Sequence, residues 1–114
     1  MYWDISLDQN SKSTWGWSQN SLVSVDAATK TFRYNHDYYL LKHFTHFVDV
    51  GAKNLEPNGT CDDTLAFVNP DGTVVAILRN ELSRPQRVQL RVGDRTLTAE
   101  LPPDSVSTLA VNPA

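Results

Sequence analysis

The residues best suited to binding a ligand lie close together near the start of the chain. Trp15-Gly16-Trp17 is followed by two amides, Gln19 and Asn20. Aromatic faces stack on flat rings, and side-chain amides both donate and accept hydrogen bonds. This combination suits a flat ligand rich in hydroxyl groups, of the size of a sugar. The two indole rings could equally fill a gap between a helix and a loop, and the residues alone leave both interpretations open.

Carboxylates that could act as a catalytic pair are harder to find. The three glutamates are Glu56 in a connecting segment, Glu81 in a turn and Glu100 on the outward side of a strand. Glycoside hydrolysis needs two carboxyl groups that flank the scissile bond, and none of these lies in an apolar segment where a proton donor is expected. Asp4, next to Trp3, has no evident carboxylate partner. We therefore expect no catalytic residue in this chain.

Metal and cofactor chemistry is also not expected. His43 and His46 are three residues apart on a predicted helix and can be neighbours, but no third ligand accompanies them, so no metal site is predicted. A structural role is expected, with His43 hydrogen-bonded to a loop. Cys61 is the single cysteine. It lies in a loop directly before Asp62 and Asp63, and these neighbouring carboxylates make it a poor nucleophile. The chain has no Gly-x-Ser-x-Gly nucleophile motif and no phosphate-binding glycine loop.

Bulk properties narrow the possible partners. The chain has 114 residues and a net charge of −3, and its basic residues are dispersed. It therefore lacks the electrostatic signature of a protein that binds nucleic acid or an anionic membrane. No apolar run is long enough to span a bilayer. Residues 1–3 lead directly into a strand-like segment, so no signal peptide is predicted, and the compartment stays unknown.

The element expected to organise the chain is one amphipathic helix over residues 35–50. Asn35 is a good N-cap, and Asp37 lies in the first turn, where the helix dipole favours negative charge. Gly51 follows where a left-handed residue often ends a helix. The apolar face comprises Leu40, Leu41, Phe44, Phe47 and Val48. A helix of roughly three to four turns is marginal by itself, so this face needs a partner surface.

Short strands are predicted on both sides of the helix. Residues 2–7 alternate aromatic or aliphatic side chains with polar ones, which is a strand pattern, and residues 22–25 form another short strand-like run. A short connector strand is expected at 52–56. Five further strands are expected at 64–69, 73–80, 86–92, 95–101 and 105–111. Turn residues separate them, and the run at 73–80 is apolar on both faces, as in a central strand. This pattern indicates a β-sandwich.

The order of the motifs is similar to a known family. The opening strand with Trp3, the Trp15-Gly16-Trp17 segment and the helix with His43 and Phe44 resemble, in this order, the C-terminal part of glycoside hydrolase family 30. The resemblance is closest to the glucosylceramidase-like members. The strands at 65–72 and 74–80 resemble the β-sandwich that accompanies the barrel in that family.

This resemblance implies a mainly β fold with one long helix, divided into two parts. Residues 1–51 would be the last strand, loop and helix of an incomplete (β/α)8 barrel, and residues 52–114 a C-terminal β-sandwich. Barrel active sites lie at the C-terminal ends of the strands. The resemblance therefore implies that Trp3 lines the sugar pocket. It also implies that Trp15, Trp17, Gln19 and Asn20 lie in a loop near its rim.

The resemblance also implies what the chain does not contain. The family uses a retaining mechanism with two glutamates, on barrel strands four and seven, and neither strand is represented here. The implied parent enzyme hydrolyses β-glucosides or glucosylceramide, a reaction of sphingolipid metabolism, and is often secreted or lysosomal. This chain would be inactive alone, and its partners would be a glycan substrate and the missing N-terminal barrel portion of the same enzyme. The alternatives are a standalone carbohydrate-binding β-sandwich and a structural accessory module.

Overall fold

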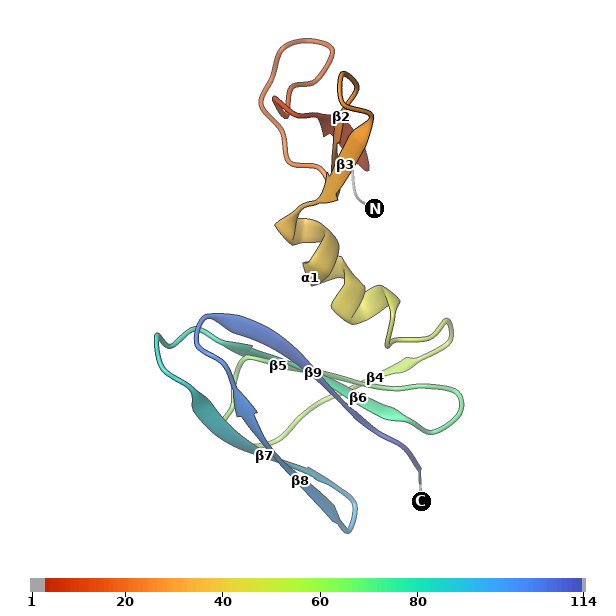
Figure 1. Ribbon diagram of the computed structural model, residues 1–114. Helices are drawn as coiled ribbons and strands as arrows, with labels where there is room; N and C mark the ends of the chain where they lie inside the picture. Colours follow the sequence, from red (N-terminus) through yellow and green to blue (C-terminus); the bar gives the residue numbers. More distant parts are fainter. Residues whose placement is uncertain (1–3, 114) are drawn as a thin grey trace. The chain divides into compact units, whose positions relative to one another are not determined.

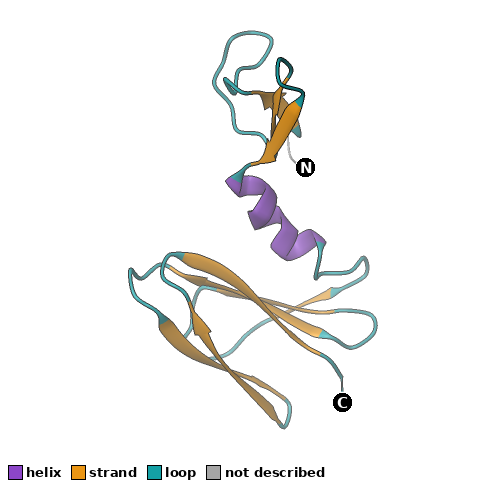
Figure 2. Ribbon diagram, in the orientation of Figure 1, coloured by secondary structure: helices purple, strands orange, loops and turns teal. Residues whose placement is uncertain are grey.

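The computed structural model describes residues 4–113. The chain forms two compact units, Met1–Lys42 and His43–Ala114, and each is considered separately below. Within the described residues the secondary structure consists of nine short strands and one helix (Figures 1 and 2). The mainly β composition predicted from the sequence is confirmed. The division into a barrel part at 1–51 and a sandwich at 52–114 stays a prediction.

The N-terminal unit is built on a three-stranded sheet. Its strands are β1 (Ser6–Asp8), β2 (Val23–Asp26) and β3 (Thr31–Tyr34), in the order β1-β2-β3. β1 pairs in parallel with β2, and β2 and β3 form an antiparallel hairpin. Residues 2 and 3 of the predicted strand lie outside the described residues. Of the rest, Asp4 and Ile5 are not part of β1, and β1 ends one residue later than predicted, at Asp8.

The apolar side chains of this sheet are not packed into a core. Ile5 and Phe32 are 69% and 65% exposed, and Val25 and Tyr34 are also exposed. Among the described residues of this unit, the only fully buried side chains are two serines, Ser21 and Ser24. A sheet with exposed aliphatic and aromatic residues and buried serines does not gain the usual stabilisation from apolar burial. Its apolar surface is available to a partner.

The helix is shorter than predicted. α1 spans His36–Thr45, 10 residues with Asp37 in its first turn and no buried residue. The predicted continuation to residue 50 is wrong: one further helical bond runs from the Val48 N–H to the Phe44 carbonyl at 2.9 Å, and the chain at Phe47 and Asp49 is bonded from outside the helix. Asn69 Nδ2 donates to the Phe47 carbonyl at 2.9 Å, and the Asp49 N–H donates to Asn69 Oδ1 at 3.0 Å. Gly51 has the expected positive φ of 90°, but it lies in the following turn.

The sandwich unit contains a four-stranded antiparallel sheet and a hairpin. The sheet has the order β4-β5-β6-β9, and the hairpin consists of β7 and β8 (Figure 1). Their bounds are Lys53–Leu55 (β4), Thr64–Val68 (β5), Val74–Asn80 (β6), Gln86–Val92 (β7), Arg95–Leu101 (β8) and Ser105–Val111 (β9). The five strands predicted after the connector are all present, and their bounds differ from the prediction by at most one residue. β6 is central, as its apolar sequence predicted.

The core of the sandwich lies between β6 and the hairpin. Ala76 and Leu78 of β6 pack with Val88 of β7 and Leu101 of β8, and all four are buried. Leu90, Ala99, Leu109 and Cys61 pack around this cluster. These contacts join the two layers, so the strands at 64–111 form the sandwich that the alternating pattern indicated.

Candidate functional site

The loop that carries the predicted ligand-binding residues is closed by its own backbone. Lys12 and Ser18 form an isolated antiparallel bridge, and the Ser13 N–H donates to the Trp17 carbonyl at 2.9 Å. Ser13 Oγ also accepts from the Trp17 N–H at 3.2 Å. At the tip, Gly16 has a φ of 80°, a conformation that glycine adopts without steric cost. The sequence Trp-Gly-Trp therefore places two indoles on one tight turn.

The two indoles form an exposed pair. Trp15 and Trp17 are 76% and 65% exposed, and their ring centroids are 6.0 Å apart with planes inclined by 36°. Such exposure is uncommon for tryptophan, which is highly buried on average. Within the described residues these rings do not fill a gap between the helix and a loop. Both rings are open to a ligand, and the stacking role for them stays a prediction.

Gln19 and Asn20, two further predicted site residues, differ in how exposed they are. Asn20 is exposed one residue before the buried Ser21. The Gln19 N–H donates to the Ser11 carbonyl at 2.9 Å, while its side-chain oxygen is buried and has no hydrogen-bond partner in residues 4–113. A buried acceptor normally requires a donor, so the Gln19 side chain has an unmet bonding capacity within residues 4–113. Trp3 lies outside the described residues.

A buried polar network that the sequence did not reveal anchors the end of this loop. Asn35 Nδ2 donates to the Ser21 carbonyl and to Ser24 Oγ, each at 2.9 Å. Ser21 Oγ in turn donates to the Val23 carbonyl at 2.9 Å. Asn35 occupies the predicted N-cap position directly before His36, and the Tyr38 N–H donates to its carbonyl at 3.1 Å. Its side chain connects β2 and the loop to the start of α1. The separation of 14 residues between Asn35 and Ser21 explains why local sequence patterns did not show it.

An aromatic cluster follows this network. Tyr34 and Tyr38 are stacked, with centroids 4.0 Å apart and planes inclined by 13°. Phe32 packs edge-on to Tyr34, and Tyr39 packs edge-on to both tyrosines. The structure places both helix tyrosines against the end of β3.

The acidic residues do not form a catalytic pair within the described part of the chain. Glu56, Glu81 and Glu100 are all exposed, and Glu81 forms an ion pair with Arg79 at 2.9 Å. Hydrogen bonds from Thr29 lower the pKa of Asp26, and hydrogen bonds from Thr73 lower the pKa of Asp71. A carboxyl group that donates a proton in glycoside hydrolysis needs a raised pKa, so neither aspartate fits that role.

His43 and His46 contact other side chains of the fold. His43 Nδ1 and Thr108 Oγ1 are 2.7 Å apart, which joins α1 to β9 instead of to the predicted loop. His46 packs edge-on to Phe47. No group of three potential metal ligands occurs in residues 4–113.

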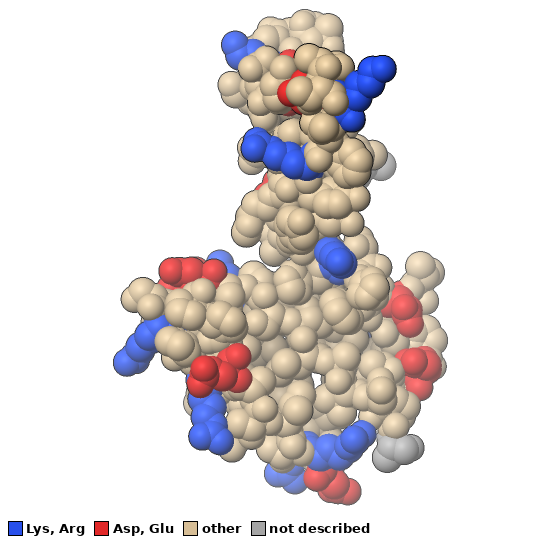
Figure 3. Space-filling view, in the orientation of Figure 1, with Lys and Arg blue, Asp and Glu red and all other residues tan. Residues whose placement is uncertain are grey.

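Figure 3 shows basic and acidic residues interspersed over the visible face of the sandwich unit. Across the described range, no helix has the length and apolarity to cross a membrane.

Comparison with known proteins shows to which family this chain belongs. The model of the glycosyl hydrolase family 30 beta sandwich domain matches residues 50–109, more than half of the chain. The chain belongs to glycoside hydrolase family 30. The resemblance inferred from the sequence is thereby confirmed at the level of the family. The match includes β4 to β8 and most of β9, the part of the chain that forms the sandwich.

Two solved structures are similar to nearly the whole chain. The crystal structure of SrfJ from Salmonella typhimurium has 26% identity and a TM-score of 0.86 over 96% of this chain. The endo-beta1,6-glucanase BT3312 has 24% identity and a TM-score of 0.82 over 95% of this chain, which shows a shared fold. The chain spans only about a quarter of these proteins, 25% and 26% of their respective lengths.

Proposed function

We propose that this chain is the C-terminal segment of a retaining β-glycosidase of the glucosylceramidase type, and that it contacts the sugar but has no activity alone. The observation that carries this proposal is the exposed Trp15–Trp17 pair on a backbone-closed loop, in a chain that belongs to a glycosidase family. Exposed indole faces bind the apolar faces of sugar rings, whereas the amides of Gln19 and Asn20 suit the hydroxyl groups. Trp3 would line the same pocket.

The two catalytic glutamates and the rest of the barrel would come from the portion of the enzyme that this chain does not span. Two observations support this division of labour. The chain spans about a quarter of the proteins it resembles, and its described N-terminal unit exposes Ile5 and Phe32 while burying two serines. Packing against the remaining barrel strands would bury these apolar side chains, and that burial is the main favourable term in association.

The proposed substrate class is a β-glucoside, with glucosylceramide as the lipid-linked example. An assay with aryl β-glucosides tests the division of labour directly. The isolated chain should give no turnover above the buffer rate. Coexpression with the barrel portion of a glucosylceramidase-type enzyme should restore turnover. Turnover by the isolated chain that is lost on changing one of its own residues would show that it carries catalytic groups, contrary to the proposal.

A standalone carbohydrate-binding module is the second candidate, and the same tryptophan pair favours it. All three tryptophans, at positions 3, 15 and 17, precede the sandwich, so tryptophan fluorescence reports on this region alone. Titration of the isolated chain with glucosides and xylo-oligosaccharides separates the candidates. A saturable shift that Trp17→Ala removes would favour the binding module. A structural accessory would show no shift and would instead copurify with a barrel chain.

A further inference from the structure

Asn58 is followed by Gly59 in the loop that connects β4 and β5. Among the eight asparagines of the chain, it is the only one that precedes a glycine. Both residues are exposed and lie outside any helix or strand. The side-chain amide of an asparagine can be attacked by the backbone nitrogen of the next residue, and glycine hinders this attack least because it has no side chain. The pair is therefore a candidate for chemistry within the chain itself.

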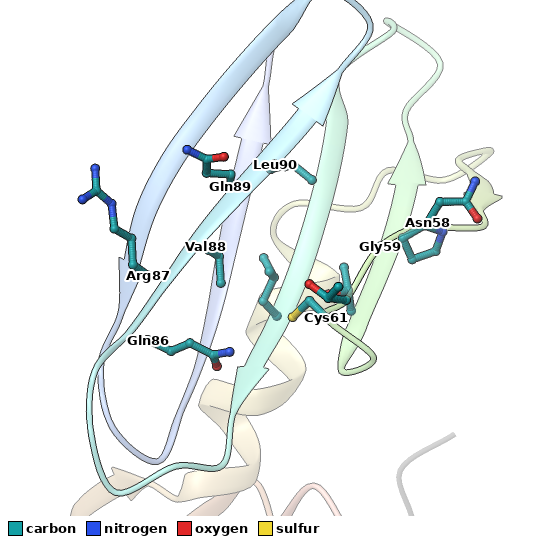
Figure 4. A pocket seen from close by; sticks show the side chains of 12 residues that line it. Asn58, Gly59, Cys61, Gln86, Arg87, Val88, Gln89 and Leu90 are labelled. Carbon is teal, nitrogen blue, oxygen red and sulfur yellow. The ribbon is translucent and has the colours of Figure 1, made fainter.

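The structure leaves both reacting groups of this pair free. Neither the Gly59 N–H nor the Asn58 side chain forms a hydrogen bond within residues 4–113. Gly59 has a φ of 145°, and a methyl group there would have no heavy atom within 4 Å. Figure 4 shows the Asn58 amide directed away from Cys61. A loop without such bonds changes its backbone angles at little cost in free energy, so the nitrogen of Gly59 can reach the amide carbon of Asn58.

Five of the other asparagines are protected by the following residue or by their own bonds. Asn69 and Asn112 precede proline, which has no N–H to react. Asn35 and Asn80 each donate their side-chain amide to a backbone carbonyl, at 2.9 Å and 2.8 Å. Asn54 lies within β4, whose backbone is paired with β5. In these five the amide or the attacking nitrogen is therefore absent or held in place.

The remaining two asparagines, Asn10 and Asn20, each precede a serine. The Ser11 N–H, which would have to attack Asn10, donates to the Asp8 carbonyl at 3.0 Å. Ser21, which follows Asn20, is only 2% exposed. Both attacking nitrogens belong to residues that the fold holds, whereas the nitrogen of Gly59 does not.

We propose that Asn58 is a site of spontaneous deamidation. The Gly59 nitrogen gives up its proton to solvent and bonds to Asn58 Cγ, and the bond from Cγ to Nδ2 breaks, so that ammonia leaves and a five-membered succinimide forms. Water then opens this ring. Cleavage between the nitrogen and Cγ gives aspartate, and cleavage between the nitrogen and the main-chain carbonyl carbon gives isoaspartate. In sum one water enters and one ammonia leaves, without oxidation or reduction.

The conversion changes the charge and the length of the β4–β5 connection. Residues 54–78 already include Glu56, Asp62 and Asp63 but neither lysine nor arginine, and either product adds a further carboxylate. In isoaspartate the main chain runs through the former side-chain carbon, so the connection becomes longer by one atom. The inference concerns residues of the sandwich unit alone and does not rest on the proposed function.

Mass spectrometry of the folded 114-residue chain, incubated at mildly alkaline pH, tests the proposal. The tryptic peptide of residues 54–79 should gain the mass difference between an amide and an acid, with the change at residue 58 as a mixture of aspartate and isoaspartate. Its rate should lie within about tenfold of that in a synthetic peptide of residues 55–62, because the loop costs little to rearrange. A slower rate in the folded chain would show that the fold protects the pair, and would overturn the proposal.

Two variants test the nitrogen and the amide separately. Gly59→Pro removes the attacking N–H, whereas Asn58→Gln keeps the loop backbone and lengthens the side chain, so that a five-membered ring cannot form. Both should abolish the conversion at residue 58. Asn10→Gln is the matched control at an exposed position and should leave that conversion unchanged. Conversion that persists in Gly59→Pro would overturn the mechanism, and conversion at Asn10 or Asn20 as fast as at Asn58 would overturn the assignment of the site.

Discussion

Asn69 holds the backbone at Phe47, 22 residues away in the sequence: its Nδ2 donates to the Phe47 carbonyl at 2.9 Å. Its Oδ1 accepts from the Asp49 N–H at 3.0 Å, and the side chain is buried. Both polar groups of one amide are therefore used to end the helix and attach the following turn to the β5–β6 hairpin. The hydrogen bonds to this amide, and not the apolar periodicity of the sequence, determine where the helix ends.

Replacing this amide should destabilise the sandwich unit. Asn69→Ala leaves the Phe47 carbonyl and the Asp49 N–H without their partner, and each such loss costs about 1–3 kcal/mol when the group stays buried. Urea unfolding followed by far-UV circular dichroism measures the change. Asn54→Ala, at an exposed position of β4, serves as the control and should change the stability little. Equal stability of the two variants would show that the amide does not attach the turn.

The buried end of the hairpin should contribute more than its exposed part. Leu101 is 1% exposed within the core, whereas Leu97 on the same strand is 38% exposed. Leu101→Ala should cost about 2–5 kcal/mol because it removes apolar contacts and leaves a cavity. Leu97→Ala should cost clearly less in the same denaturation experiment. Similar losses for both variants would contradict the placement of the core at β6 and the Leu101 end of the hairpin.

Asp71 should make the stability of the sandwich depend on pH in the acid range. Hydrogen bonds from the Thr73 N–H and hydroxyl lower the pKa of Asp71 below its ordinary value of 3.8. A lowered folded-state pKa adds stability that is present above the unfolded-state pKa and lost as pH falls through the folded-state pKa. Asp71→Asn should flatten this part of the curve of urea midpoint against pH. A curve as steep in Asp71→Asn as in the unchanged chain would contradict this pH dependence.

How much of the fold the sequence predicted depends on how far apart in the sequence the interacting residues lie. Strands β7, β8 and β9 follow local alternation and turn residues, and their predicted bounds agree with the structure. What the sequence did not show falls where distant side chains bind the backbone, as Asn69 does at Phe47 and Asn35 does at Ser21. Trp15 and Trp17 were recognisable from residue type, but their exposure was not, since exposure depends on what the rest of the fold covers.

Gly16 should be needed for the tryptophan pair to bind sugar. Its φ is 80°, and a methyl group there would have no heavy atom within 4 Å, so Gly16→Ala acts through backbone strain alone. That strain costs about 1 kcal/mol or more and opposes the turn that orients Trp15 and Trp17. The tryptophan fluorescence response to glucosides should weaken while the circular dichroism of the sandwich stays unchanged. Gly59→Ala is the matched control, because Gly59 also has a positive φ and open space around it but lies in the sandwich unit. A full sugar response in Gly16→Ala would show that the turn does not position the stacking surface.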